Sequence, residues 1–425
     1  MQSPALYVKP KLILHFDVNE TIMVGDPAGG DTLEDCLNKI VCKNAYVKGS
    51  EKSMHLPTHW SISYYFCLFH HYHACIFHYL LNRGVIELLL LCDICVYLPH
   101  SLTHKYAQTH AHSRTISLPS SHIHFHRYNG TPSSSNNPPP LYTDWNIPEG
   151  SVAYYRAGHV VNPYKKNFTE NGAPGMPYRF AYNDMKTALI WPADSDADPD
   201  PRLCHDGKHH FLLPAFFHTI STLKQQGRSF GVVIRTFGSD AIDVVHALNA
   251  FAEGKHLSSI SPVDEMKIDA SMNVWHGSYS EDGQFRLRRG QDELGEVEAL
   301  SLLEARSQHI SCVVCTDDYK WWRAHGYHPS AGKPLWITKD DSTCHHIFFD
   351  DNIHALEDDS IVSVRVRESA NHPFRVMSGN EILLQQGIHL VRTPTIEPIL
   401  NPSWFVEQIG KCEAAYAARQ STSFL

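Results

Sequence analysis

Three apolar runs in this chain end in side chains that can do chemistry. The run LILHF is followed by Asp17 and Asn19, and the run FGVVIR is followed by Thr236. The run HIFF is followed by Asp350 and Asp351. Carboxylates from two such ends offer the hard oxygen ligands that Mg²⁺ prefers, and one carboxylate can also act as a nucleophile. With a hydroxyl and an ammonium group nearby, this set suits the transfer of a phosphoryl group.

These side chains can meet only if the runs are strands of one sheet. Apolar runs predict strands at 12–16, 229–237, 309–317, 344–351, 360–366 and 386–394. Helical spacing of apolar residues predicts helices at 208–227, 239–254, 318–328 and 401–420. Strands that alternate with helices imply a parallel sheet with helices on both faces. Ligands bind such sheets at the carboxyl ends of the strands, where the polar residues stand.

Length, charge and cysteine content limit the classes of protein. The chain of 425 residues is long enough for two or three domains. A net charge of −9 and the lack of a dense Lys/Arg block argue against a nucleic-acid partner. The eleven cysteines have no regular spacing, and no signal peptide is recognisable. We therefore expect reduced thiols, a cytoplasmic location and no membrane partner.

Residues 53–140 differ from the rest of the chain. They are rich in histidine, contain only the acids Glu87 and Asp93, and close in a Ser/Asn/Pro tract. Scattered histidines lack the fixed spacing of a metal site, and the apolar stretches are too short or too polar for a membrane hairpin. We interpret the segment as a poorly structured insertion or as translated non-coding sequence.

The ordered motifs HFDVNETI, VVIRTF and HHIFFDDNIH resemble three motifs of the haloacid dehalogenase-like hydrolase superfamily. The resemblance covers roughly residues 10–50 and 205–410. It implies an α/β fold in which a Rossmann-like parallel sheet carries helices on both faces, with a cap inserted after the first strand. It divides the chain into a first part of the core at 1–50, the insertion at 53–140, a cap-like region at 141–204 and the remainder of the core at 205–425.

The resemblance also implies a role for each site residue. Asp17 would be the nucleophile and a ligand of Mg²⁺, and the backbone carbonyl of Asn19 would be a second ligand. Thr236 would hold a phosphoryl oxygen, and Asp350 and Asp351 would anchor the metal. The lysine of the family corresponds best to Lys333 in SAGKPLWI, with Lys320 as the alternative. The implied activity is that of an Mg²⁺-dependent phosphatase acting on a small phosphorylated molecule. The sequence does not specify an oligomeric state.

The amide at Asn19 departs from the pattern of the family. Phosphatases of the family usually carry an aspartate at this position, which protonates the leaving group and then activates water. Three hypotheses follow. Another residue, such as Glu20 or a histidine of the cap, supplies the proton, or the substrate needs little protonation. Alternatively, the protein binds phosphate with little or no turnover. A dehalogenase is a further alternative, but it would leave Asp350 and Asp351 without a purpose.

Overall fold

In a computed structural model of the chain, the described residues between positions 9 and 47 and between positions 141 and 423 belong to one compact unit. The structure describes residues 9–25, 30–48, 141–143, 151–156, 165–192, 199–259, 262–269, 274–306, 310–339, 341–353 and 360–423. The interpretation of residues 53–140 as an insertion lies outside the described residues.

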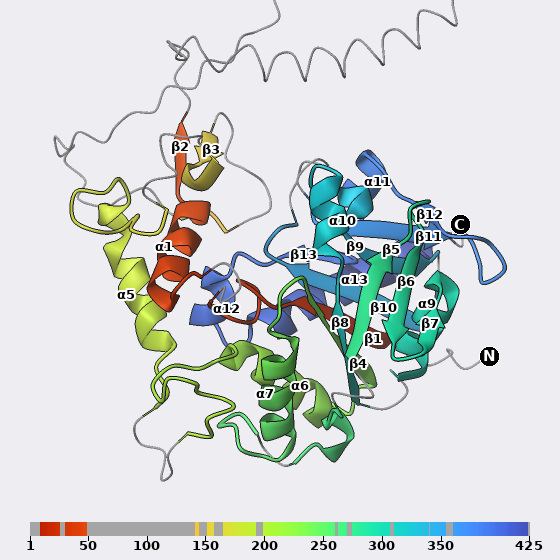
Figure 1. Ribbon diagram of the computed structural model, residues 1–425, viewed down its shortest axis with the longest axis horizontal. Helices are drawn as coiled ribbons and strands as arrows, with labels where there is room; N and C mark the ends of the chain where they lie inside the picture. Colours follow the sequence, from red (N-terminus) through yellow and green to blue (C-terminus); the bar gives the residue numbers. More distant parts are fainter. Residues whose placement is uncertain are drawn as a thin grey trace, which may run out of the picture. The chain divides into compact units, whose positions relative to one another are not determined.

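A large, mostly parallel sheet forms the centre of the unit (Figure 1). Among the described residues it has eight strands, in the order β13-β10-β1-β4-β8-β5-β6-β7, of which the six from β13 to β5 run parallel. The prediction of an α/β fold with a mostly parallel sheet is confirmed. The strands are β1 Lys11–Asp17, β4 Phe230–Thr236, β5 Val274–Tyr279, β6 Phe285–Arg289, β7 Asp292–Leu294, β8 Ser311–Thr316, β10 Cys344–Asp350 and β13 Leu390–Arg392.

Strands β1, β4 and β10 are buried on both faces. Every residue of β4 and β10 is buried, and so is every residue of β1 after Lys11. Continuous burial is typical of parallel strands covered on both sides, and it explains why these runs are almost unbroken in hydrophobicity. Each apolar run stops at the carboxyl end of its strand, where a polar side chain can reach a ligand.

Helices cover both faces of the central sheet. Leu14 and Phe16 of β1 face a core completed by α6, α7 and α13, whereas Ile13 faces a core that includes residues of α9. No helix in the described part of the chain is long and apolar enough to cross a membrane. The helices are α1 Leu33–Asn44, α5 Arg179–Ala188, α6 Pro214–Gln225, α7 Ala241–Ala252, α9 Glu296–Arg306, α10 Tyr319–Ala324, α11 Asn380–Leu383, α12 Ile396–Leu400 and α13 Trp404–Ser423.

A second, three-stranded sheet lies beside the central one. It has the order β12-β11-β9, with β9 and β11 parallel and β12 antiparallel. Its strands are β9 Lys333–Thr338, β11 Val362–Arg367 and β12 Arg375–Val376. The sequence analysis did not predict β9, which begins with the lysine that the resemblance assigned to the site.

Part of the cap-like region packs on α1, the helix that follows β1. The segment β3 Ser151–Ala153, the short helix η1 Tyr154–Arg156 and α5 all contact α1. Strand β3 also pairs with β2 Tyr46–Lys48, directly after α1. The described residues of this region therefore belong to the same compact unit as the central sheet.

Two of the predicted helices are shorter than expected. The helix predicted at 208–227 begins only at Pro214, because a proline has no backbone N–H to donate within a helix and is favoured in its first turn. The helix predicted at 318–328 ends at Ala324, because Gly326 and Tyr327 have the positive φ angles of 65° and 63°.

The order of the strands reverses beside β1. Strands β4 and β8 lie on one side of β1, while the later strands β10 and β13 lie on its other side. Open sheets of this kind bind ligands outside the carboxyl ends of the strands at the point of reversal. Here that point lies between the ends of β1 and β10.

Candidate active site

Three aspartates gather where the strand order reverses. Asp17 is the last residue of β1 and Asp350 the last residue of β10, and their neighbours Phe16 and Phe349 are partners in the strand pairing. Carboxylate oxygens of Asp17, Asp350 and Asp351 lie within 4.8 Å of one another, and all three residues are buried. We call these three residues the aspartate cluster.

Lys333 reaches the aspartate cluster from the second sheet. Its ammonium nitrogen contacts Oδ1 of Asp17 and lies 2.9 Å from Oδ2 of Asp350. The residue is 1% exposed, so its charge is held almost entirely by these two carboxylates. Lys320, the alternative, is an exposed residue of α10 with no contact to the cluster among the described interactions. Of the two candidate lysines, the structure brings Lys333 to the acids.

Thr236 lies at the same end of the parallel strands, but its hydroxyl forms hydrogen bonds with residues of its own loop. The residue ends β4, one position beyond the pairing of Asp17 with Arg235. Its Oγ1 donates to Oδ2 of Asp240 at 3.2 Å and accepts from the N–H of Gly238 at 2.9 Å. No described contact joins this hydroxyl to the aspartate cluster.

Asn19 stands in the loop directly after β1. The residue is half-buried and forms an isolated backbone bridge with Met23. The side-chain oxygen Oδ1 is buried and has no hydrogen-bond partner among the described residues. A buried oxygen without a partner is uncommon in folded proteins, and it leaves this amide available to a ligand.

Thr21, which the sequence analysis did not select, ties the two loops of the site together. Its Oγ1 donates to Oδ2 of Asp17 at 3.1 Å and accepts from the N–H of Asp351, also at 3.1 Å. One hydroxyl therefore fixes the nucleophile candidate relative to the end of β10. The motif DVNET contains this threonine, but its contact with Asp351 depends on a residue 330 positions away in the chain.

Two lysines of α1 complete the charges around the cluster. Lys43 contacts both Glu20 and Asp351, with 2.7 Å to Oδ2 of Asp351, and Lys39 lies 2.7 Å from Glu20. Four residues apart on a helix, the two ammonium groups share one face. The sequence contains this spacing, but nothing in it shows that this face of the helix meets the end of β10.

Glu20 is an unsuitable proton donor in this arrangement. Burial alone would raise the pKa of Glu20, but the charges of Lys43 and Lys39 lower it below its ordinary value. The carboxyl group is therefore ionised near neutral pH. The other candidate, a histidine of the cap-like region, corresponds to His159, which lies outside the described residues.

The aspartate cluster carries more negative charge than its lysines balance. Burial, together with repulsion from Asp350 and Asp351, raises the pKa of Asp17 well above its ordinary value despite the attraction of Lys333. Burial also raises the pKa of Asp351 to about 6, against the charge of Lys43. Burial alone would lower the pKa of Lys333, but Asp17 and Asp350 outweigh it and raise that pKa. An additional cation would relieve the repulsion.

The donor set of the cluster fits a hard divalent cation. All three side chains offer carboxylate oxygens, which suit Mg²⁺, and none offers the sulfur or imidazole that a softer metal prefers. A second group, Glu304, Asp341 and Cys344, also has oxygens and sulfur within 4.8 Å. That group lies at the opposite end of β10, away from the point where the strand order reverses.

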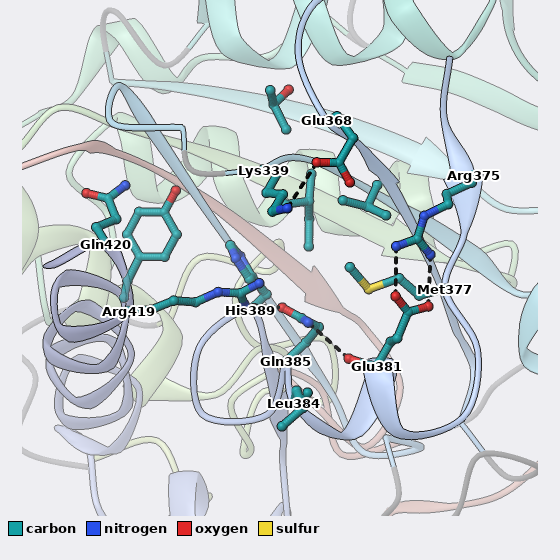
Figure 2. A pocket seen from close by; sticks show the side chains of 14 residues that line it. Lys339, Glu368, Arg375, Met377, Glu381, Leu384, Gln385, His389, Arg419 and Gln420 are labelled. Carbon is teal, nitrogen blue, oxygen red and sulfur yellow. Dashed lines mark hydrogen bonds and ion pairs between the residues drawn. The ribbon is translucent and has the colours of Figure 1, made fainter. Parts of the chain in front are cut away.

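A separate cavity of about 180 Å³ lies beyond the far ends of β9 and β11, lined also by α11 and α13 (Figure 2). It contains none of the predicted site residues. Its two carboxylates each have a cationic partner: Arg375 forms two hydrogen bonds with Glu381, and Lys339 pairs with Glu368 (Figure 2). The cavity therefore lacks the surplus of carboxylates that marks the aspartate cluster.

Comparison of the chain with family models, with curated proteins and with solved structures found no match.

Proposed function

We propose that this protein is an Mg²⁺-dependent phosphohydrolase of the haloacid dehalogenase-like type, with Asp17 as its nucleophile. The observation that carries the proposal is the aspartate cluster with Lys333, at the point where the strand order reverses. Carboxylates and an ammonium group converge there, at the edge where open parallel sheets bind their ligands. The order of the strands also supports a Rossmann-like core.

In this proposal each side chain acts on the phosphoryl group or on another side chain. The carboxylate of Asp17 attacks phosphorus and forms an aspartyl-phosphate, and the leaving oxygen departs with its electron pair. Lys333 offsets negative charge on the phosphoryl oxygens. Thr21 orients Asp17 through its hydrogen bond. Asp17, Asp350, Asp351 and the backbone carbonyl of Asn19 would hold Mg²⁺, which would supply further positive charge to the phosphoryl group.

The described part of residues 141–204 supports the assignment of a cap. It packs on α1, whose Lys43 contacts Asp351. Tyr155 of η1 places its ring 5.3 Å from the ammonium nitrogen of Lys43. A region that approaches the site in this way would close over a small phosphorylated molecule, which favours such a substrate over a phosphoprotein.

A second candidate function is phosphate binding with little turnover. Asn19 cannot exchange a proton with a leaving group or with water, and its oxygen lacks a partner. In that case the cluster would hold a metal and a phosphorylated ligand without hydrolysing it. A dehalogenase is less well supported, because it would leave Asp350 and Asp351 without a purpose.

Phosphate release from a panel of small phosphorylated molecules, with and without Mg²⁺, tests these functions. The full-length protein is compared with Asp17→Asn and Asn19→Asp, and with Asp292→Asn as a control in an exposed ion pair. Mg²⁺-dependent release that Asp17→Asn abolishes supports the phosphohydrolase. Release from Asn19→Asp alone supports the binding function. The absence of release from every variant contradicts the catalytic proposal for these substrates.

A further inference from the structure

The lysine of the site is carried by a strand outside the central sheet. Strand β9 pairs with β11 in the second sheet, and no described strand pairing joins it to the eight central strands. Lys333 is nevertheless its first residue and must meet Asp17 at the end of β1. Something other than strand pairing must therefore fix β9 relative to the central sheet.

Arg235 of β4 bonds to the backbone on one side of Lys333. Its Nη1 donates to the carbonyl oxygen of Pro334 at 2.8 Å. The guanidinium group is held in place by Asp317, whose two oxygens accept from Nε and Nη2 at 3.0 and 2.6 Å. Arg235 is 1% exposed, so this geometry is enclosed by the protein. Planar, two-point pairing of this kind fixes the direction of the remaining N–H groups.

Tyr279 of β5 bonds to the backbone on the other side of Lys333. Its hydroxyl donates to the carbonyl oxygen of Gly332 at 2.6 Å. Burial raises the pKa of Tyr279 to about 12, so the phenol keeps its proton and remains a donor. The ring is stacked on Trp321, with ring centroids 5.5 Å apart, which restricts its orientation. The two residues that flank the lysine are thus each bonded to a side chain of the central sheet.

Gly332 permits this close approach. A Cβ atom at this position would stand 1.9 Å from the carbonyl oxygen of Ile361, which also accepts from the N–H of Lys333 at 2.8 Å. The start of β9 is therefore pressed against the backbone that leads into β11. Any side chain here would force the backbone of residue 332 and that of Ile361 apart.

We propose that Arg235 and Tyr279 are positioning residues that clamp the backbone around Lys333 and so hold its ammonium group between Asp17 and Asp350. We call this pair the lysine clamp. The idea that the clamp matters for turnover rests on the proposed function, but the idea that it fixes the position of Lys333 does not. Misplacement of a catalytic group by about 1 Å can slow a reaction by about 100-fold.

Whether the clamp holds Lys333 in place can be tested without an enzymatic assay. Amine acylation followed by digestion and mass spectrometry gives the labelling rate of each lysine. In the parent protein Lys333 is expected to react slowly, because it is 1% exposed, and Lys320 is expected to react fast. The test variants are Tyr279→Phe, which removes one hydroxyl, and Arg235→Met. Tyr416→Phe is the matched control. The hydroxyl of Tyr416 also donates to a backbone carbonyl, that of Asp341, which lies far from the aspartate cluster.

We expect Tyr279→Phe to raise the acylation rate of Lys333 by about 2- to 10-fold, the range for loss of one hydrogen bond. Arg235→Met is expected to raise it at least as much, and Tyr416→Phe to change it less than twofold. The rate at Lys39, which is buried in another ion pair, should stay constant in all variants. If Arg235→Met fails to fold, Tyr279→Phe alone decides the question.

Kinetics with the best substrate of the panel then connects position to function. The ammonium group of Lys333 acts mainly on charge that grows in the transition state. In Tyr279→Phe and Arg235→Met, kcat should therefore fall by about 10-fold or more while KM changes little. An unchanged acylation rate of Lys333 in both variants, or an equal rise at Lys39, overturns the clamp. Faster acylation with unchanged kcat overturns its role in turnover. Faster acylation in a protein that releases no phosphate supports the clamp and contradicts the proposed function.

Discussion

Two groups of buried charges lie at the same edge of the central sheet and differ in how their charges balance. Arg235 and Asp317 form a one-to-one pair with two parallel hydrogen bonds, and the remaining nitrogen of the guanidinium, Nη1, donates to the carbonyl oxygen of Pro334. The aspartate cluster has three carboxylates, and among the residues that the structure describes two ammonium groups contact it directly, those of Lys333 and Lys43.

The balance of charge distinguishes the Arg235–Asp317 pair, which suits a structural role, from the aspartate cluster, which suits the binding of a cation. A buried ion pair whose hydrogen bonds are all satisfied contributes order and leaves nothing for a ligand. A group with surplus charge of one sign is costly to bury, and its cost falls when a ligand of the opposite sign binds. The two groups should therefore respond in opposite ways when one acid is neutralised.

The largest expected effect is the loss of activity in Asp17→Asn. Without the nucleophile that we propose, the protein should release phosphate at least about 10⁴-fold more slowly. The unfolding midpoint in urea should not fall, because one of three mutually repelling carboxylates has been removed. A strong loss of stability in this variant would mean that the cluster is a structural group like the Arg235–Asp317 pair.

The next largest effect is the loss of stability in Asp317→Asn. This change leaves the guanidinium of Arg235 buried without a counter-charge, which costs about 3–5 kcal/mol of unfolding free energy. Urea denaturation measures the loss. The control is Asp292→Asn, which breaks the exposed pair with Arg289 and should cost less than about 1 kcal/mol. Similar losses in both variants would contradict the distinction between the two pairs.

A smaller effect is expected in the pH dependence of the metal-free protein. The pKa of Asp351 is raised from 3.8 to about 6 by burial, so the folded protein binds this proton more tightly than the unfolded chain. The resulting stabilisation is fully present below about pH 4 and is lost as the pH rises through 6. Asp351→Asn should remove this loss, worth up to about 3 kcal/mol.

Denaturation of the parent and of Asp351→Asn between pH 4 and 7.5, in the presence of a chelator, measures the difference. As the pH rises, the free energy of unfolding of Asp351→Asn should increase relative to that of the parent. A difference that does not change with pH would show that Asp351 keeps an ordinary pKa in the folded protein.

The smallest effect is the stabilisation by Mg²⁺. At about ten times the dissociation constant, a metal that binds only the folded protein adds about 1.4 kcal/mol. A thermal melt of the parent should therefore shift upward with Mg²⁺, and Asp350→Asn should lose the shift. A variant in the balanced group, Asp317→Asn, should melt lower but keep its shift. Equal shifts in all three proteins would place the metal elsewhere.

The strands that bear the site could be predicted because their signals are local. Asp17, Thr236 and Asp350 each end an apolar run, and that pattern indicates a buried strand that opens onto an edge of the sheet. Parallel order followed from the alternation with helices. The family resemblance, and not a local signal, assigned Lys333 to the site with Lys320 as the alternative, and it did not predict that Lys333 begins a strand of a second sheet.

The contacts that complete the site could not be predicted, because they join residues far apart in the chain. Thr21 is ordinary in its own sequence context and becomes part of the site only through Asp351. Lys43 sits on an amphipathic helix whose facing surface is set by tertiary packing. Strands β5–β7 were missed as well. The run VWHGSY of β5 is short and only partly apolar, and β6 and β7 carry several charged residues.

The position of β1 in the sheet also has a consequence for the synthesis of the chain. Strand β1 pairs with β10, and Leu12 of β1 lies opposite His345, more than 300 residues later. At about 5–20 residues per second, a ribosome needs roughly 20–70 s to make that partner. During this time one edge of an apolar strand has no native neighbour. The nascent protein should therefore depend on chaperones that bind apolar segments until β10 has been translated.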